Sequence, residues 1–127
     1  MPIQRIEDVL QQYEDAFNQG DLDALLALYE PQATLTLQPG QTAAGAAAIR
    51  TVLGSFLALK GRMEIAEIGP QQIVQAGDTA LVSGSWTITG TGSNGEPVVM
   101  SGRSTDVVRL QPDGTWRWVI DVPFGIN

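Results

Sequence analysis

The chain has no cysteine and no histidine among its 127 residues. The lack of cysteine excludes disulfides, thiolate catalysis and thiol-ligated zinc. The lack of histidine excludes a Ser-His-Asp triad and every metal site that uses imidazole. Acid–base chemistry in this protein therefore has to use Asp, Glu, Tyr, Lys or Arg side chains. We expect no metal and no cofactor.

Basic residues are few, and long apolar runs are missing. Seven Lys and Arg residues stand against fourteen Asp and Glu residues, which gives a net charge of −7. An acidic surface argues against nucleic acid and anionic membranes as partners. No apolar run approaches the roughly 20 residues of a membrane span, and Met1–Asn18 lacks the apolar block of a signal peptide. We expect a soluble, cytoplasmic protein that binds neither nucleic acid nor membrane.

The hydrophobic content of 43% is typical of a globular protein, and we expect residues 1–127 to form a single domain. In the first half of the chain, apolar residues recur at spacings of three and four, as they do on one face of a helix. Gly20 is a natural helix end, and Asp21 is a good N-cap for the next helix. The pattern predicts helices over Ile3–Gln19, Leu22–Tyr29 and Gly45–Leu59, with a strand over Ala33–Gln38.

From Arg62 onward the helical periodicity gives way to the alternation of strands. Ser93–Glu96 has the composition of a hairpin turn. Three helices followed by antiparallel strands make an α+β domain, and a curved sheet wrapped around helices leaves an interior suited to a small-molecule pocket. In the strand predicted over Thr79–Thr91, Val82, Trp86 and Ile88 share one face. The other predicted strands are Met63–Ile68, Gln72–Gln75, Val98–Leu110 and Trp116–Val122.

The stretch Val98–Leu110 places a carboxylate on the apolar face of its strand. Regular alternation puts Asp106 on the same face as Val108 and Leu110. A carboxylate among core residues is costly unless it is paired, protonated or next to a wet cavity. Asp106 is therefore a candidate functional residue. The alternative is a carboxylate that simply lies in water at the mouth of the sheet.

Three stretches carry a resemblance to a known family: YEDAFNQGDLDALLALYEPQAT (residues 13–34), NGEP (94–97) and STDVVRLQPDGTW (104–116). Together with Gly45 and Ile49, they resemble the nuclear transport factor 2-like superfamily, and within it the ketosteroid isomerase and SnoaL-like (polyketide cyclase-like) branch. The resemblance implies a cystatin-like fold, in which a cone-shaped, curved antiparallel sheet wraps around three N-terminal helices. It implies less about function, because function depends on the site rather than on the fold.

The resemblance also implies roles for single residues. Tyr13 matches the tyrosine that donates a hydrogen bond to the oxyanion in ketosteroid isomerase. Asp106 matches the aspartate that an apolar site keeps protonated in that enzyme. Tyr29 matches a supporting tyrosine. The place of the catalytic base holds Leu37, which cannot move a proton.

The last predicted strand leaves the direction of Asp121 open. By alternation, Asp121 lies opposite Trp118, so a core-facing tryptophan would turn it outward. The resemblance implies the reverse, with Val119, Asp121 and Pro123 in the pocket, and we favour it. Asp121 is then a candidate base, and two carboxyl groups in one pocket would have pKa values pushed apart. The opposite face would be an outer surface that a homodimer partner covers. That face carries Trp116, Trp118, Ile120 and Val122.

Two classes of function stay open. One is an isomerase, cyclase or lyase that acts on a small carbonyl compound through an enolate, with Tyr13, Asp106 and Asp121 as catalytic residues. The other is a non-catalytic ligand-binding protein or dimeric scaffold with a vestigial pocket. The expected ligand is small and hydrophobic or carbonyl-containing. The residues expected to line the pocket are Tyr29, Leu37, Phe56, Trp86, Ser104 and Val119.

Overall fold

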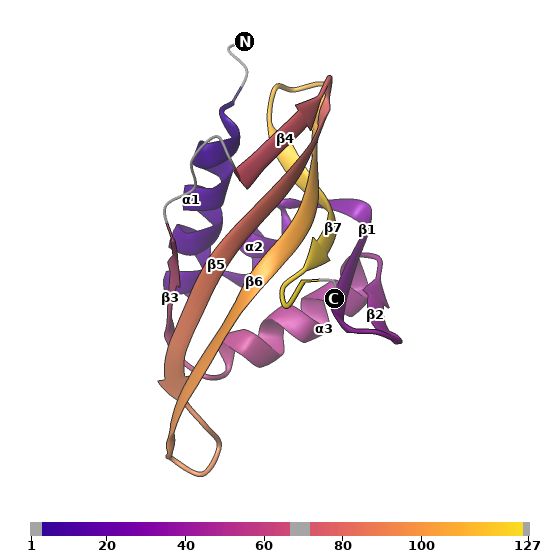
Figure 1. Ribbon diagram of the computed structural model, residues 1–127. Helices are drawn as coiled ribbons and strands as arrows, with labels where there is room; N and C mark the ends of the chain where they lie inside the picture. The colour runs from indigo at the N-terminus through magenta and orange to yellow at the C-terminus, as the bar shows by residue number, and fades with distance from the viewer. Residues whose placement is uncertain (1–3, 67–71, 126–127) are drawn as a thin grey trace.

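The computed structural model describes residues 4–66 and 72–125. A curved sheet of long strands has the helices gathered on one side of it, behind the two longest strands in the view of Figure 1. The helices are α1 (Ile6–Asn18), α2 (Leu22–Leu26) and α3 (Ala46–Leu57). The strands are β1 (Tyr29–Gln38), β2 (Gln41–Ala44), β3 (Arg62–Ile65), β4 (Ile73–Ala76), β5 (Thr79–Thr91), β6 (Pro97–Leu110) and β7 (Trp116–Val122).

The helices form where apolar residues recur on one side. In α1 the buried side chains include Val9, Leu10 and Phe17, spaced as predicted. Asp21 caps α2, because its carboxylate accepts a hydrogen bond from Ala24 N at 3.0 Å. The three predicted helices are therefore present, with shifted bounds.

The second helix is shorter than predicted. α2 ends at Leu26, and Tyr29 begins β1 instead of ending a helix. Tyr29 pairs with Trp118 of β7, and this tertiary pairing outweighs the helical spacing of the local sequence. The short strand Gln41–Ala44 was not predicted. Residues 3 and 68, where two predicted elements begin or end, lie outside the described residues.

The described strands form one sheet in the order β2-β1-β7-β6-β5-β3, and β4 also pairs with β5. Neighbouring strands are antiparallel except β1 and β7, which are parallel. The predicted all-antiparallel sheet is wrong in this one pair, because a long connection between two strands lets them run the same way. The α+β class with a curved sheet and N-terminal helices is confirmed.

The longest strands, β5 and β6, form a hairpin that supplies much of the inner wall. Val82, Trp86 and Ile88 of β5 are buried, and the residues between them are more exposed, as the alternation predicts. The hairpin turns at Gly95, whose φ of 83° favours glycine. Asp106 of β6 is buried on the same inner face, opposite Val82.

A β-bulge in β7 decides which side chains reach the interior. The register with β6 shifts at Val119, which is an extra residue between Trp118 and Ile120. Beyond the bulge the alternation restarts on the other face. Trp118 and Asp121 are therefore both buried, at 3% and 6% exposed. Regular alternation allows only one of these two side chains to face the core, but the structure turns both inward.

Trp116 and Trp118 do not form an outer surface. Each side chain is 3% exposed, and Trp116 Nε1 donates a hydrogen bond to the backbone oxygen of Gln4 at 2.9 Å. The predicted dimer face that included these tryptophans was wrong. Trp116 and Trp118 face the core, and the bulge at Val119 allows Asp121 to face the core as well. Of that set only Ile120 is exposed, while Val122 is buried.

Side chains of α1 cover the free edge of β3. Asn18 Nδ2 donates to Met63 O at 3.0 Å, and Asn18 Oδ1 accepts from Met63 N at 2.7 Å. Glu14 Oε1 accepts from Ile65 N at 2.7 Å. The helix thus satisfies this edge as a neighbouring strand would. These bonds also fix the position of Tyr13, the residue next to Glu14, relative to the sheet.

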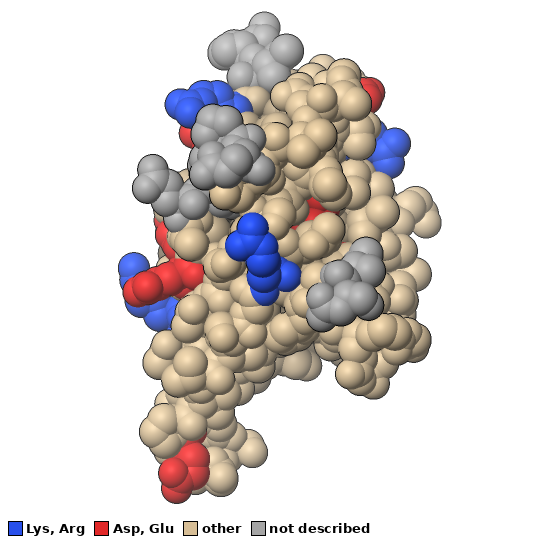
Figure 2. Space-filling model, in the orientation of Figure 1, with Lys and Arg blue, Asp and Glu red and all other residues tan. Residues whose placement is uncertain are grey.

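Charged side chains stand singly or in small groups on a mostly uncharged surface in the view of Figure 2. Three ion pairs join described residues, and all involve solvent-exposed or partly exposed side chains. Within residues 4–66 and 72–125, no helix combines the length and the apolar character that crossing a bilayer requires.

Candidate functional site

A cavity of ≈ 70 Å³ lies between the helices and the inner face of the sheet. Its walls are mostly apolar, and its hydroxyl and carboxyl groups come from Tyr13, Ser85, Ser104, Asp106 and Asp121. The apolar walls include Leu10, Phe17, Leu35, Leu53, Phe56 and Met63.

Two carboxyl groups lie side by side in the wall of this cavity. Asp106 of β6 and Asp121 of β7 are directly opposite each other in the register of the two strands. Both residues are 6% exposed, and their side chains are in hydrogen-bond contact. Two carboxylates in contact cannot both be ionised without a cation, so this pair shares a proton.

Asp106 receives two N–H donors. Val122 N donates to Asp106 Oδ1 at 2.9 Å, and Trp118 Nε1 donates to Asp106 Oδ2 at 3.3 Å. Both groups can only donate, so they favour the ionised form of Asp106. The bulge at Val119 is what brings the indole of Trp118 to this position.

The two tyrosines extend the pair toward the cavity. The Tyr29 hydroxyl donates to Asp121 Oδ2 at 2.5 Å, and the hydroxyl oxygens of Tyr13 and Tyr29 are 2.9 Å apart. The Tyr13 ring packs against the Trp118 ring, with 5.0 Å between centroids. Tyr13, Tyr29, Asp121 and Asp106 thus form one continuous hydrogen-bonded chain, which we call the tyrosine–carboxyl chain.

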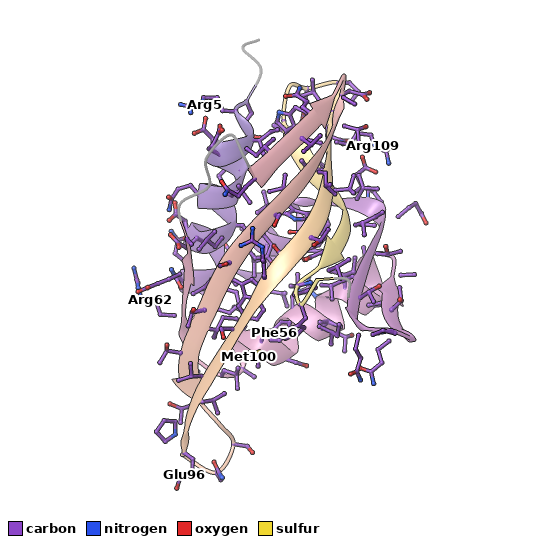
Figure 3. All side chains as sticks on the ribbon, viewed as in Figure 1. Arg5, Phe56, Arg62, Glu96, Met100 and Arg109 are labelled. Carbon is purple, nitrogen blue, oxygen red and sulfur yellow. The ribbon has the colours of Figure 1, made fainter. Side chains whose placement is uncertain are left out.

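No lysine or arginine is among the described residues that line the cavity. The arginines labelled in Figure 3, Arg5, Arg62 and Arg109, lie at the periphery of the molecule. Among the residues that the structure describes, every buried side-chain nitrogen or oxygen has a hydrogen-bond partner. The hydrogen-bonding groups of the tyrosine–carboxyl chain are therefore satisfied by hydroxyl, indole and backbone groups and by the shared proton, without a cation.

Burial shifts the pKa values of all four members of the tyrosine–carboxyl chain. Burial and the neighbouring Asp106 carboxylate raise the pKa of Asp121 well above its usual range. Burial also raises the pKa of Asp106, but hydrogen bonds from Asp121, Val122 and Trp118 oppose that rise. Burial and the Asp121 charge raise the pKa of both tyrosines, so the phenols are neutral. The rise expected for the pKa of Asp106 is present in direction, and the pKa of its partner Asp121 is raised as well.

The segment that follows β7 closes one side of the cavity. Pro123 lines the cavity, and its backbone oxygen accepts a hydrogen bond from Trp86 Nε1 at 2.7 Å. The Phe124 ring packs edge-on against Trp86 at 5.4 Å. This arrangement needs Gly102, because a Cβ there would lie 2.8 Å from Pro123 O.

The structure brings most of the predicted site residues together. Tyr13, Phe56, Trp86, Ser104, Asp106 and Asp121 all line the cavity. Tyr29 lies behind the cavity wall and reaches it through Tyr13. Leu37 does not line the cavity; Leu35, two residues earlier in β1, does. Val119 does not line it either, because it is the bulged residue between the two inward-facing side chains.

Sequence reasoning missed Trp118 as part of the site. Trp118 was assigned to an outer face, and its hydrogen bond to Asp106 depends on the bulge. Pro123, which the resemblance turned toward the pocket, lines the cavity. Among the described residues, no group of three or more Asp or Glu side chains could hold a metal ion.

A curved sheet that encloses a largely apolar pocket beneath N-terminal helices is a cystatin-like fold. The sequence model of the SnoaL-like domain family matches residues 9–119. The chain belongs to the SnoaL-like domain family.

Solved structures share the fold at low sequence identity. A nuclear transport factor 2-like protein from Salmonella enterica has a TM-score of 0.79 and 19% identity over 92% of this chain and 85% of that one. A ketosteroid isomerase-like protein from Erwinia carotovora has a TM-score of 0.74 and 24% identity over 92% and 90%. A protein with a cystatin-like fold from Novosphingobium aromaticivorans has a TM-score of 0.74 and 21% identity over 92% and 77%. No curated protein matches the sequence significantly.

Proposed function

We propose that this SnoaL-like domain binds a small, largely apolar carbonyl compound or its enol, and that the Asp106–Asp121 pair moves a proton on it. The observation that carries the proposal is a buried pair of carboxyl groups, in contact and without a cation, in the wall of an apolar cavity. The ketosteroid isomerase-like neighbour adds support through the fold alone.

A carboxyl pair that shares one proton contains an acid and a base at the same place. The ionised member can take a proton from carbon next to a carbonyl, and the protonated member can return one. Asp106 and Asp121 both line the cavity, so either can face a bound ligand. Leu37, which stands in the sequence where the base of ketosteroid isomerase would be, has no part in this mechanism.

Exchange of hydrogen for deuterium beside the carbonyl of cyclohexanone tests the proposal without knowledge of the natural substrate. NMR in D2O measures the exchange rate with native protein and with the double variant Asp106→Asn/Asp121→Asn. Since a positioned acid or base contributes roughly 10²–10⁴ in rate, we expect the native protein to exceed the double variant by at least the lower figure. Glu30→Gln, which removes a carboxylate outside the cavity, should retain the native rate. Equal rates for native protein and double variant would contradict the catalytic role.

One observation favours a second function, non-catalytic binding. Both oxygens of Asp106 already accept N–H hydrogen bonds, and a carboxylate held in this way is a weaker base. In that case cyclohexanone would shift the NMR signals of the cavity residues while its exchange rate stayed at the buffer value.

We also propose that the protein forms a homodimer, now through exposed apolar side chains of the outer sheet face and not through the tryptophans. Leu81, Val99 and Ile120 are exposed at 45%, 70% and 40%, and they lie on the strands of the outer sheet face. An exposed apolar face favours self-association. Sedimentation velocity at micromolar concentration tests it, and a monomer would contradict it.

A further inference from the structure

The tyrosine–carboxyl chain has a direction, because each hydroxyl carries one hydrogen. The single hydrogen of Tyr29 is used in the bond to Asp121 Oδ2. The 2.9 Å contact between the two hydroxyl oxygens then needs the hydrogen of Tyr13. Tyr13 therefore donates to Tyr29, and Tyr29 donates to Asp121.

This direction does not depend on which carboxyl group holds the shared proton. The proton lies between Asp106 and Asp121, where their side chains are in contact. If Asp121 holds it, its O–H donates to Asp106, a bond that raises the pKa of Asp121, and Oδ2 accepts from Tyr29. If Asp106 holds it, Asp121 is ionised and can only accept. In both cases Asp121 Oδ2 is an acceptor, and the hydrogens of both tyrosines point away from the cavity.

We propose that Tyr13 presents its lone pairs to the cavity, so that the pocket selects a ligand whose polar group donates a hydrogen bond: a neutral alcohol, phenol or enol. This inference rests on the proposed function and narrows it to the hydroxyl form of the ligand. It reverses the role that the resemblance implies for Tyr13, which is donation to an oxyanion. A carbonyl or oxyanion placed at Tyr13 would meet another acceptor.

The surroundings of the chain support the same polarity. The ionisable groups in contact with it are its own members, one each from α1, β1, β6 and β7. Trp118 Nε1 is turned to Asp106, and the Ser104 hydroxyl has two protein acceptors within reach, the backbone oxygen of Gly84 at 3.3 Å and the Asp106 carboxyl group. These neighbouring donors are thus directed at protein acceptors rather than at the cavity.

A matched pair of ligands tests the polarity directly. Cyclohexanol and cyclohexanone have the same ring and one oxygen, and only the alcohol can donate a hydrogen bond. NMR titration of the native protein near neutral pH gives the two dissociation constants. We expect the alcohol to bind about tenfold more tightly, since facing one acceptor with another leaves a buried polar atom unpaired.

Two isosteric variants locate the effect. In Tyr13→Phe the polar contact is gone, and the two dissociation constants should agree to within about twofold, which also measures the intrinsic difference between the ligands. In Tyr29→Phe the Tyr13 hydrogen loses its partner and is free to face the ligand, so the preference should move toward the ketone. Circular dichroism checks that each variant is folded, and the native comparison needs no variant.

The outcomes separate this inference from the proposed function. A native protein that binds the ketone as tightly as the alcohol, or more tightly, would overturn the polarity while small-molecule binding stands. An alcohol preference that survives in Tyr13→Phe would also overturn it. Failure of both ligands to bind at millimolar concentration would contradict the proposed function and the polarity together.

Discussion

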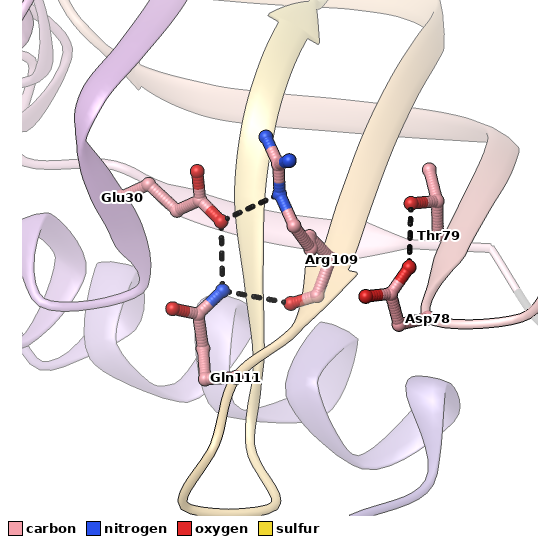
Figure 4. Close-up of polar contacts among 5 residues, drawn as sticks. All are labelled: Glu30, Asp78, Thr79, Arg109 and Gln111. Carbon is pink, nitrogen blue, oxygen red and sulfur yellow. Dashed lines mark hydrogen bonds and ion pairs between the residues drawn. The ribbon is translucent and has the colours of Figure 1, made fainter.

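Two clusters of hydrogen-bonded side chains neutralise their carboxylates in opposite ways: a surface cluster around Glu30 and an interior cluster around Asp106 and Asp121. At the surface, Glu30 Oε2 accepts from Arg109 Nε at 2.9 Å and from Gln111 Nε2 at 2.8 Å (Figure 4). In the interior, Asp106 and Asp121 are held by hydroxyl, indole and backbone donors and by a shared proton. The surface carboxylate is neutralised by a cation, and the buried carboxyl pair by a proton.

The difference shows what burial does to a charge. An ion pair with partly exposed side chains contributes little and weakens in salt. A buried carboxylate without a cation must share a proton, so its state depends on pH instead. The shared proton gives the interior cluster acid–base chemistry that the surface cluster lacks. A variant in one cluster can therefore be compared with a variant in the other cluster or at a neutral position.

The largest effect is expected from Asp106→Ala. The variant leaves the indole N–H of Trp118 and the backbone N–H of Val122 without their acceptor, and unpaired buried donors are costly. We expect a loss of about 2–4 kcal/mol in the free energy of unfolding, measured by urea denaturation. Asp106→Asn, which keeps an acceptor oxygen, should lose less. A loss no larger than that of Glu30→Ala would contradict the account.

Gly102→Ala should come next. The new Cβ would lie 2.8 Å from Pro123 O and 3.0 Å from the rings of Phe124 and Trp86, so the wall that Pro123 forms has to move. We expect a loss of about 1–3 kcal/mol in the free energy of unfolding, as for other overpacked sites. Gly54→Ala is the control, since its nearest contact is an ordinary 4.0 Å to Leu22. Equal stability of the two variants would argue against a fixed wall.

The pH dependence of stability separates the clusters further. The pKa of Asp121 is raised from an ordinary value of 3.8. Above that value the folded protein holds a proton that the unfolded chain has released, so the free energy of unfolding falls as pH rises toward the raised pKa. The slope for one group is at most about 1.4 kcal/mol per pH unit. Urea denaturation between pH 5 and pH 8 should give a shallower slope for Asp121→Asn than for native protein; parallel slopes would contradict the shared proton.

The smallest effect is expected at the surface. Glu30→Gln removes the charge that faces Arg109; the Arg109 side chain is 46% exposed and the Glu30 side chain is 18% exposed. We expect a loss of about 1 kcal/mol or less at low salt. At 1 M NaCl, where the screening length falls to about 3 Å, the difference from native protein should vanish. A loss that persists in high salt would assign the role of Glu30 to its hydrogen bonds rather than to its charge.

The sequence was sufficient for the fold class and for most elements. The alternation in β5 predicted the buried faces of Val82, Trp86 and Ile88, because a half-buried strand repeats every two residues. The sequence also singled out Asp106, since a carboxylate on an apolar face is costly. These predictions depend on local periodicity, which the structure preserves.

What could not be predicted depends on contacts between distant strands. A bulge at Val119 leaves no mark in the alternation of β7, so the sequence could not show that Trp118 and Asp121 both face inward. Tyr29 fits the helical spacing and begins a strand instead, because it pairs with β7. The contact between Asp106 and Asp121 follows from the same register, and no local pattern encodes it.

The central claim is that Asp106 and Asp121 share one proton near neutral pH. A titration of the side-chain carboxyl carbons by NMR, assigned with Asp106→Asn and Asp121→Asn, measures this directly. We expect the pair still to hold one proton at pH 7. Two carboxyl groups that both titrate at or below the ordinary value of 3.8 would contradict it.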